Sequence, residues 1–349
     1  MKTNPRAILL LVLLLAVGQL GFAESEWIYA ASGSQYLVLN PGDGTIVRRG
    51  ELRADGFALG NGDTGIASQS ETPRIVPTPG GRYVFFVYSK ADRAVVVDAE
   101  SHLPVWTVDL PRGTRSIVFS TMGDTILAHT GGTSWVELPH RQGRITGPGR
   151  PAPTFGGGSL AFNRRGTRVY GNRGGDLVYA LSSSGEPVQT VSLEGGPYDW
   201  HISPTFRFLV GASQAGLAVV DEVRGRVVGY LDGSYAAGVF HPNSREFYAL
   251  TSAGEAVVVV DVARGRERSR IRPPEALGAI FREDDGTLHG LSKGDTAGAA
   301  IVLDLTGRQR RVALPVDFAA PEGTAGGSSP AGVRATVVTL RPGGGFACF

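Results

Sequence analysis

The chain has 349 residues, including 50 Gly, 21 Pro and a single cysteine, Cys348, so no intramolecular disulfide can form. Lys and Arg number 34 against 32 Asp and Glu. This balance argues against a nucleic-acid or anionic-membrane partner, which would require a basic excess or a basic run.

Residues 1–23 have the features of a secretory signal peptide. Lys2 and Arg6 precede the apolar run of residues 7–17, and small residues at 21 and 23 occupy the positions that a signal peptidase reads. The run is shorter than the ~20 apolar residues of a comfortable membrane span. We therefore expect cleavage after Ala23, no membrane span in the mature protein, and a periplasmic or secreted location. An uncleaved membrane anchor is the alternative.

The mature chain contains a repeat of about 40 residues. A short apolar run recurs seven times, with its last residue at Asn40, Asp98, Leu138, Leu181, Asp221, Asp261 and Asp304. The intervals are 40 or 43 residues, except for the first, which is 58. Four-stranded propeller blades repeat every ~40 to 45 residues. Residues 24–315 are therefore predicted to form an all-β, seven-bladed β-propeller of four-stranded antiparallel blades.

The strands can be followed in chain order. The first unit contains only three, and the long first interval contains a Gly-rich inserted loop at residues 53–72. Later units have four, as in residues 238–271, where turn signals separate GVFHP, REFYALTS, EAVVVVDV and RERSRI. Residues 316–349 are predicted to form a flexible segment, a strand at 333–340 and a Gly-rich tail. That strand would pair into the first blade and close the ring.

The second unit, Pro79–Leu110, resembles the YVTN-type repeat of bacterial seven-bladed propellers, of the quinoprotein amine dehydrogenase-like kind. In that repeat a turn leads into a Tyr-Val strand, and a strand ending in Asp follows. Pro204–Leu231 and Pro242–Ile271 look like further copies, although the YVTN tetrapeptide itself is absent. Proteins with such repeats include envelope binding proteins, lactonase-like enzymes and haem d1 propellers. The resemblance therefore implies a fold and does not select a function.

Resemblance to propellers in general also implies where a ligand would lie. It would be at the mouth formed by the loops that lead into the innermost strands and by those between second and third strands. The richest such loop contains four consecutive functional side chains, from Tyr198 to His201. The ligand-binding candidates are Tyr198, Asp199, Trp200, Arg115, Tyr235 and Arg173. The catalytic candidates, none of them assigned, are Asp199, His201 and His129.

Several of these residues can be explained by a structural role alone. His201 and Trp200 align with apolar residues of the other innermost strands, which favours core packing. The Asp that ends a third strand, as at 98, 221, 261 and 304, precedes a turn and is expected to cap it. The spacing of acidic and histidine residues predicts no metal site.

Several catalytic motifs are missing. There is no Cys-x-x-Cys-His, G-x-S-x-G, H-E-x-x-H or P-loop sequence. No cofactor is predicted, and a bound metal or tetrapyrrole is left open. The first hypothesis is a non-enzymatic, exported binding or scaffold protein whose loop-bearing face recognises a protein, peptide or envelope component. The alternatives are a propeller enzyme of lactonase-like or metal-assisted hydrolase type, and an accessory protein of a periplasmic redox cofactor system.

Overall fold

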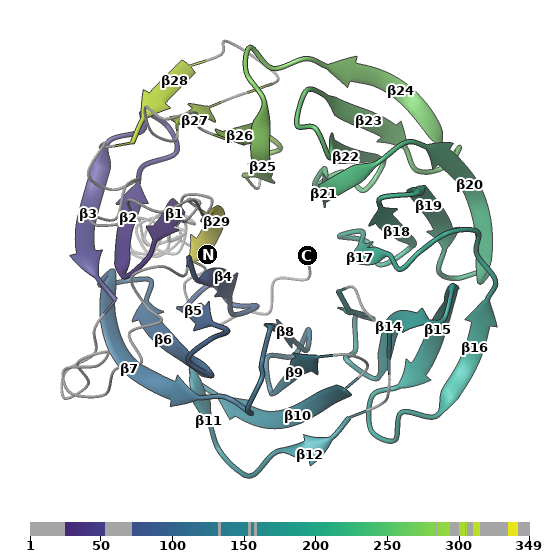
Figure 1. The fold of residues 1–349 in the computed structure, drawn as a ribbon, viewed down its shortest axis with the longest axis horizontal. Helices are drawn as coiled ribbons and strands as arrows, with labels where there is room; N and C mark the ends of the chain where they lie inside the picture. Colours follow the sequence, from purple (N-terminus) through teal and green to yellow (C-terminus); the bar gives the residue numbers. More distant parts are fainter. Residues whose placement is uncertain are drawn as a thin grey trace, which may run out of the picture.

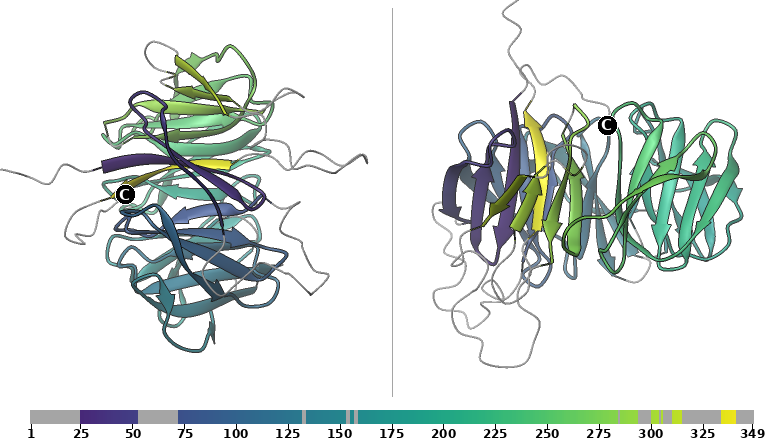
Figure 2. Two further views of the ribbon diagram at one scale, coloured as in Figure 1. Left: turned by 90° about the vertical axis from the view of Figure 1, so that its left-hand side faces the viewer. Right: turned by 90° about the horizontal axis from the view of Figure 1, so that it is seen from above.

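A computed structural model shows an all-β protein whose antiparallel sheets are arranged around a common centre (Figure 1). The structure describes residues 25–52, 72–131, 134–152, 155–156, 159–283, 285–293, 300–303, 305, 310–314 and 334–340. Figure 2 shows that the sheets stand side by side in one layer. Within the described ranges, no helix is long and apolar enough to cross a membrane.

Each sheet is a meander of strands that are consecutive in the chain, apart from the first, which also takes the last strand. The first sheet has the order β29 (Arg334–Leu340), β1 (Ser25–Ser32), β2 (Gln35–Leu39) and β3 (Ile46–Glu51). The next contains β4 (Arg74–Pro77), β5 (Tyr83–Tyr88), β6 (Arg93–Asp98) and β7 (Leu103–Asp109). The third contains β8 (Ser116–Phe119), β9 (Thr125–Gly131), β10 (Ser134–Arg141), β11 (Arg144–Ile145) and β12 (Arg150–Pro151).

The remaining sheets follow the same pattern. One contains β13 (Ala161–Phe162), β14 (Arg168–Arg173), β15 (Asp176–Leu181) and β16 (Pro187–Val191), and the next β17 (Asp199–Ile202), β18 (Phe208–Ser213), β19 (Gly216–Asp221) and β20 (Arg226–Asp232). They are followed by β21 (Tyr235–Phe240), β22 (Glu246–Thr251), β23 (Val257–Asp261) and β24 (Arg266–Ile271). The last contains β25 (Leu277–Arg282), β26 (Leu288–Ser292), β27 (Ala300–Leu303) and β28 (Arg310–Ala313).

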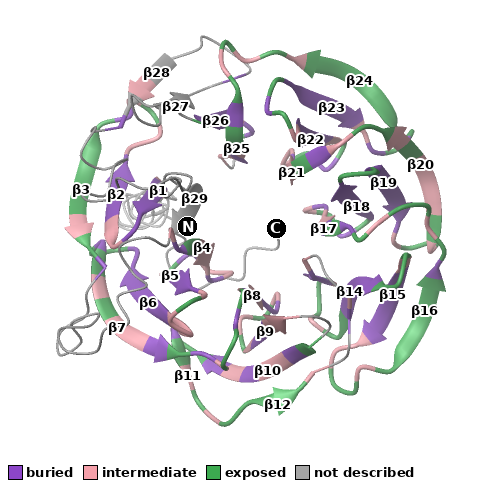
Figure 3. Cartoon of the chain, in the orientation of Figure 1, coloured by how far each residue is buried: buried purple, intermediate pink, exposed green. Residues whose placement is uncertain are grey.

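The core lies between neighbouring sheets. The middle strands are apolar on both faces, as in the valine run of β23, because each face packs against another sheet. One cluster joins Phe208 and Val219 to Phe247 and Val258 of the next sheet. Another joins Ile28 of the first sheet to Phe281 of the last. Burial decreases toward the outermost strands, of which β3, β16 and β24 are largely exposed (Figure 3).

The N- and C-terminal ends of the described chain meet in one sheet. Strand β29 pairs antiparallel with β1, with Ser25 opposite Leu340 and Ala31 opposite Arg334. This pairing supplies the strand that the three-stranded first unit lacks. The other terminal predictions, namely the signal peptide at 1–23, the flexible segment that begins at 316 and precedes the strand at 333–340, and the Gly-rich tail, lie outside the described residues. So does the inserted loop at 53–72, apart from Thr72.

The third sheet differs from its prediction. A four-stranded blade, as predicted, has one outer strand, whereas the structure divides the outer edge between β11 and β12, which both pair with β10. The segment Gly147-Pro148-Gly149 connects them, and proline has no N–H with which to continue a ladder. The outer edge of this sheet is therefore discontinuous.

The connections between strands define two faces of the layer. The loop face contains the loops that lead into the innermost strands and those between second and third strands. The turn face contains the connections between first and second and between third and fourth strands. On the turn face, Asp98 Oδ1 accepts hydrogen bonds from the N–H groups of Glu100 (2.9 Å) and Ser101 (3.0 Å). Asp221 and Asp261 accept corresponding bonds from Arg224 and Arg264. The predicted capping role is confirmed for these three residues, and Asp304 lies outside the described part.

Candidate functional site

The loop before β17 is held by a buried asparagine that the sequence did not indicate. Asn172, in β14 of the neighbouring sheet, is 1% exposed. Its Nδ2 donates to the carbonyl of Tyr198 (2.7 Å), and its Oδ1 accepts from Tyr198 N (3.2 Å) and Trp200 Nε1 (2.9 Å). Buried polar groups of a loop need such partners. The one available signal was an amide near the apolar residues Val169 and Tyr170 of β14, in a strand that has an arginine at each end.

Tyr198 and Trp200 are consequently core residues. They are 1% and 2% exposed, and their rings pack against each other with centroids 5.4 Å apart. Trp200 lies directly opposite Gly211 in the β17–β18 register. A Cβ added at Gly211 would lie 2.8 Å from both the Trp200 ring and Tyr198 Cβ. The glycine therefore provides the space that the indole occupies.

Asp199, the first residue of β17, is exposed, unlike its neighbours Tyr198 and Trp200. Its Oδ1 accepts a hydrogen bond from Ser159 N (2.8 Å), which belongs to the neighbouring sheet, and the Ser159 hydroxyl donates to the carbonyl of Trp200 (3.3 Å). These bonds fix the position of Asp199 across the boundary between two sheets. Its second carboxylate oxygen makes no hydrogen bond or ion pair with a residue that the structure describes, and it remains available to a partner at the surface.

His201 points in a different direction from the exposed loop residues. It lines a cavity of about 330 Å³, together with residues of five innermost strands that include Phe119, Phe162 and Phe240. Its Nε2 is buried and has no hydrogen-bond partner among the described residues. Burial lowers the pKa of His201, and the charge of Asp199 opposes that shift. The imidazole is therefore neutral near neutral pH.

The other predicted residues are distributed over the loop face. Arg115 and Arg173 are exposed. Tyr235 is buried, and its hydroxyl donates to the carbonyl of Asp232 (3.2 Å). His129 stacks on Trp135, with ring centroids 4.7 Å apart and an interplanar angle of 22°.

The structure thus places Tyr198 directly before β17 and Asp199, Trp200 and His201 within it, and gives the four side chains different environments. Tyr198 and Trp200 are buried supports, Asp199 is an exposed carboxylate, and His201 lines the cavity, which Trp200 also borders. Within the described part of the chain, no group of three His, Cys, Asp or Glu side chains is arranged to hold a metal ion.

No protein-family profile matches the chain, and no curated protein matches it. Solved structures of similar shape include Kuenenia stuttgartiensis hydrazine synthase, with 14% identity, a TM-score of 0.54 and coverage of 71% of this chain and 80% of that one. Dihydro-heme d1 dehydrogenase NirN in complex with DHE has 13% identity, a TM-score of 0.59 and coverages of 82% and 73%. The β-propeller domain of Myceliophteria thermophila Cps50 (Swd1) has 10% identity, a TM-score of 0.60 and coverages of 76% and 89%. At these identities the likeness shows the fold alone, which is a β-propeller.

Proposed function

We propose that the protein is a seven-bladed β-propeller, exported to the periplasm or secreted, whose ring is closed by β29. The pairing of β29 with β1 and the packing of Ile28 on Phe281 support closure. Export rests on the signal-peptide features of residues 1–23. Its function is to bind a protein, peptide or other component of the cell envelope through the loop face, as a recognition or scaffold protein without a bound cofactor.

The observation that carries this proposal is that Tyr198 and Trp200 are buried, whereas Asp199 between them is exposed. Tyr198 and Trp200 are committed to the core by Asn172, so they make the loop before β17 rigid and leave Asp199 at the surface. Arg115 and Arg173 add exposed positive charge to the same face. Charged groups held on a rigid scaffold are suited to recognition, because little side-chain or loop ordering is needed on binding.

Site-specific photo-cross-linking tests this proposal. A photo-reactive phenylalanine analogue at position 115 or 173 is expected to form adducts with an envelope component, and Asp199→Asn should reduce their yield. The matched control is position 165, an exposed arginine of the turn face. Equal adduct formation from position 165 would place recognition elsewhere and contradict the proposal.

A second candidate function, hydrolysis, is favoured by His201. The neutral His201 side chain lines the 330 Å³ cavity, and its Nε2 has no hydrogen-bond partner among the described residues. Asp199 is two residues away on the same strand. A neutral imidazole can accept a proton from an attacking water or hydroxyl. A panel of lactone and ester substrates would test this reading. Activity that His201→Gln abolishes, while the variant keeps the wild-type melting temperature, would favour the enzyme over the binding protein.

A further inference from the structure

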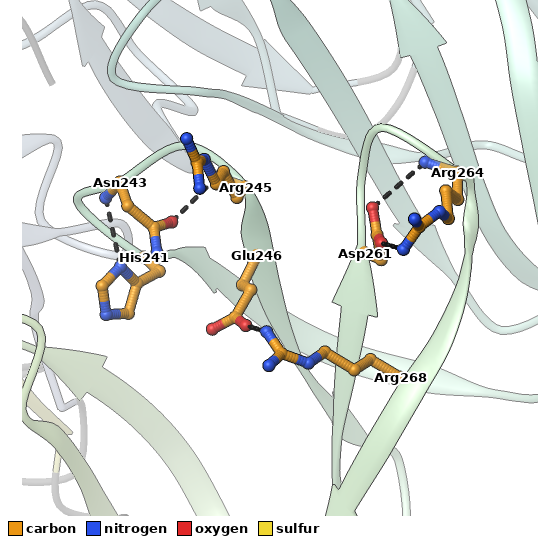
Figure 4. A network of polar contacts seen from close by, with 7 residues as sticks. All are labelled: His241, Asn243, Arg245, Glu246, Asp261, Arg264 and Arg268. Carbon is orange, nitrogen blue, oxygen red and sulfur yellow. Dashed lines mark hydrogen bonds and ion pairs between the residues drawn. The ribbon is translucent and has the colours of Figure 1, made fainter.

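A charged groove lies on the turn face of the β21–β24 sheet. It has a volume of about 690 Å³ and is formed by the start of β22, the end of β23 and the start of β24. Its charged lining consists of Arg245, Arg264, Arg266, Arg268, Glu246, Asp261 and Glu267. Figure 4 shows the two turns that border it and the hydrogen bonds and ion pairs of their residues.

The arginines of the groove fall into two pairs. Arg264 Nη1 lies 3.0 Å from Asp261 Oδ2, and Arg268 forms an ion pair with Glu246. The guanidinium groups of Arg245 and Arg266 make no ion pair with any residue that the structure describes. In Figure 4 the only contact of Arg245 goes to Asn243, and it involves the Arg245 backbone N–H. The exposed guanidinium groups of Arg245 and Arg266 are therefore available to bind an anionic group.

The arginine equivalent to Arg245 is restrained in other sheets. Arg207, in front of β18, lies over the ring of Phe208 at 5.2 Å from its centroid, with Nη2 at 4.0 Å from Asp221 Oδ2. Arg82, in front of β5, lies over Tyr83 at 5.9 Å and 2.8 Å from Asp98. In the β21–β24 sheet, Glu246 replaces the aromatic residue.

A second departure from the repeat accompanies the first. Five sheets have a β-bulge between their third and fourth strands at the same position. The bulged residue is Val47, Val105, Val188 and Val228 in four of them. In β24 it is Arg268. A bulge changes the direction in which the extra side chain points, and here it allows Arg268 to form an ion pair with Glu246.

The two replacements form one unit. Glu246 and Arg268 pair with each other, Asp261 is held by Arg264, and Arg245 loses both the aromatic platform and the carboxylate that restrain Arg207. We propose that this groove binds an acidic peptide segment of a partner protein, with separate carboxylates on Arg245 and Arg266. This surface lies on the turn face, and the inference does not depend on the proposed function of the loop face.

The spacing of the two arginines favours a peptide over a compact anion. Glu246 is opposite Asp261, which is opposite Arg266, so Arg245 and Arg266 belong to strands two positions apart, or about 10 Å. An extended chain advances about 7 Å over two residues and about 10 Å over three, so acidic side chains at such intervals can reach both guanidinium groups. A guanidinium binds a carboxylate through two parallel hydrogen bonds. The acidic residues within the groove would repel a nucleic-acid backbone.

The test measures fluorescence anisotropy of a labelled peptide of alternating Glu and Gly, with a Gln-Gly peptide as the probe control. We expect saturable binding of the Glu peptide that weakens with added salt. Arg245→Gln/Arg266→Gln should weaken it by about tenfold or more, because two charge-assisted contacts are lost. The equivalent substitutions in the preceding sheet, Arg207→Gln/Arg226→Gln, should change it less than about twofold.

A repeat-restoring variant gives an independent test. Glu246→Phe/Arg268→Val copies the arrangement of Phe208 and Val228 and keeps both free arginines. It is expected to restrain Arg245 as Arg207 is restrained and to weaken peptide binding by at least about fivefold. The proposal would be overturned if Arg245→Gln/Arg266→Gln or Glu246→Phe/Arg268→Val bound the Glu peptide with wild-type affinity. It would also be overturned if the control Arg207→Gln/Arg226→Gln lost as much affinity. Displacement of the peptide by millimolar inorganic phosphate would overturn it as well, because it would indicate a general anion site.

Discussion

Replacing Asn172 by alanine tests whether this residue organises the loop before β17. The substitution leaves Trp200 Nε1 and the backbone N–H and C=O of Tyr198 without their partner in a buried region. A buried polar group that loses its partner costs about 1–3 kcal/mol, and the groups here share one relaxing loop, so we expect the free energy of unfolding to fall by about 3 kcal/mol. Urea unfolding followed by tryptophan fluorescence measures this loss. Hydrogen exchange at 195–202 should become faster.

The control is Asn163→Ala, which removes the same atoms from a solvent-exposed turn. Asn163 Oδ1 accepts from Thr167 N (2.9 Å) and Arg168 N (3.1 Å), and water can replace it there. We expect a loss below about 1 kcal/mol. Equal destabilisation by the two substitutions, or unchanged exchange at 195–202 in Asn172→Ala, would refute the organising role of Asn172.

Two further predictions follow from the packing and the buried histidines. Gly211→Ala should reduce the free energy of unfolding by about 1–3 kcal/mol, because the added Cβ would overlap the Trp200 ring. Gly80→Ala, with no atom within 4 Å of the added Cβ, should leave this free energy nearly unchanged. Comparable losses in the two variants, measured by urea unfolding, would contradict this prediction. His140 Nδ1 donates to Gly123 O (2.6 Å), its Nε2 accepts from Gly143 N (3.0 Å), and burial lowers its pKa below 6.5. Because the unfolded chain then binds the proton more readily, stability should fall as pH decreases below 6.5, and His140→Phe should reduce that slope between pH values of about 7 and 5. An unchanged slope would refute the contribution of His140.

The fold was predictable because its signals are local and repeated. Strand lengths, turn residues and an interval of 40 or 43 residues are all properties of short segments, and each recurs often enough to identify the unit. The capping aspartates could be interpreted in the same way, because Asp98 and the backbone groups that it accepts lie within three residues. The outer edge of the third sheet was less predictable, since its division into β11 and β12 depends on which part of β10 each short strand can reach.

The site was predictable only in part, because its geometry depends on residues that are distant in the chain. The unusual composition of residues 198–201 indicates a candidate site. Composition does not show that Asn172, 26 residues before Tyr198, would bury both Tyr198 and Trp200. The strand register explains how the indole is accommodated. Trp200 is opposite Gly211, whereas the equivalent pair in the next sheet is Gly238 and Ala249. A large residue on one strand is accommodated by a small one on its partner.

Departures from the repeat therefore divide into two physical classes. Trp200 is a departure that the core absorbs, because Gly211 provides space and Asn172 accepts the indole N–H. Glu246 and Arg268 are a departure that the core does not need, because both lie at the margin of the sheet and, among the described residues, form their ion pair with each other. Having Glu246 and Arg268 in place of the aromatic residue and the valine of other sheets adds no buried apolar surface. It leaves Arg245 without the aromatic ring that Arg207 and Arg82 contact, next to a charged groove. A compensated change of the first class preserves the scaffold, whereas a paired change of the second class alters only the surface that a partner would meet.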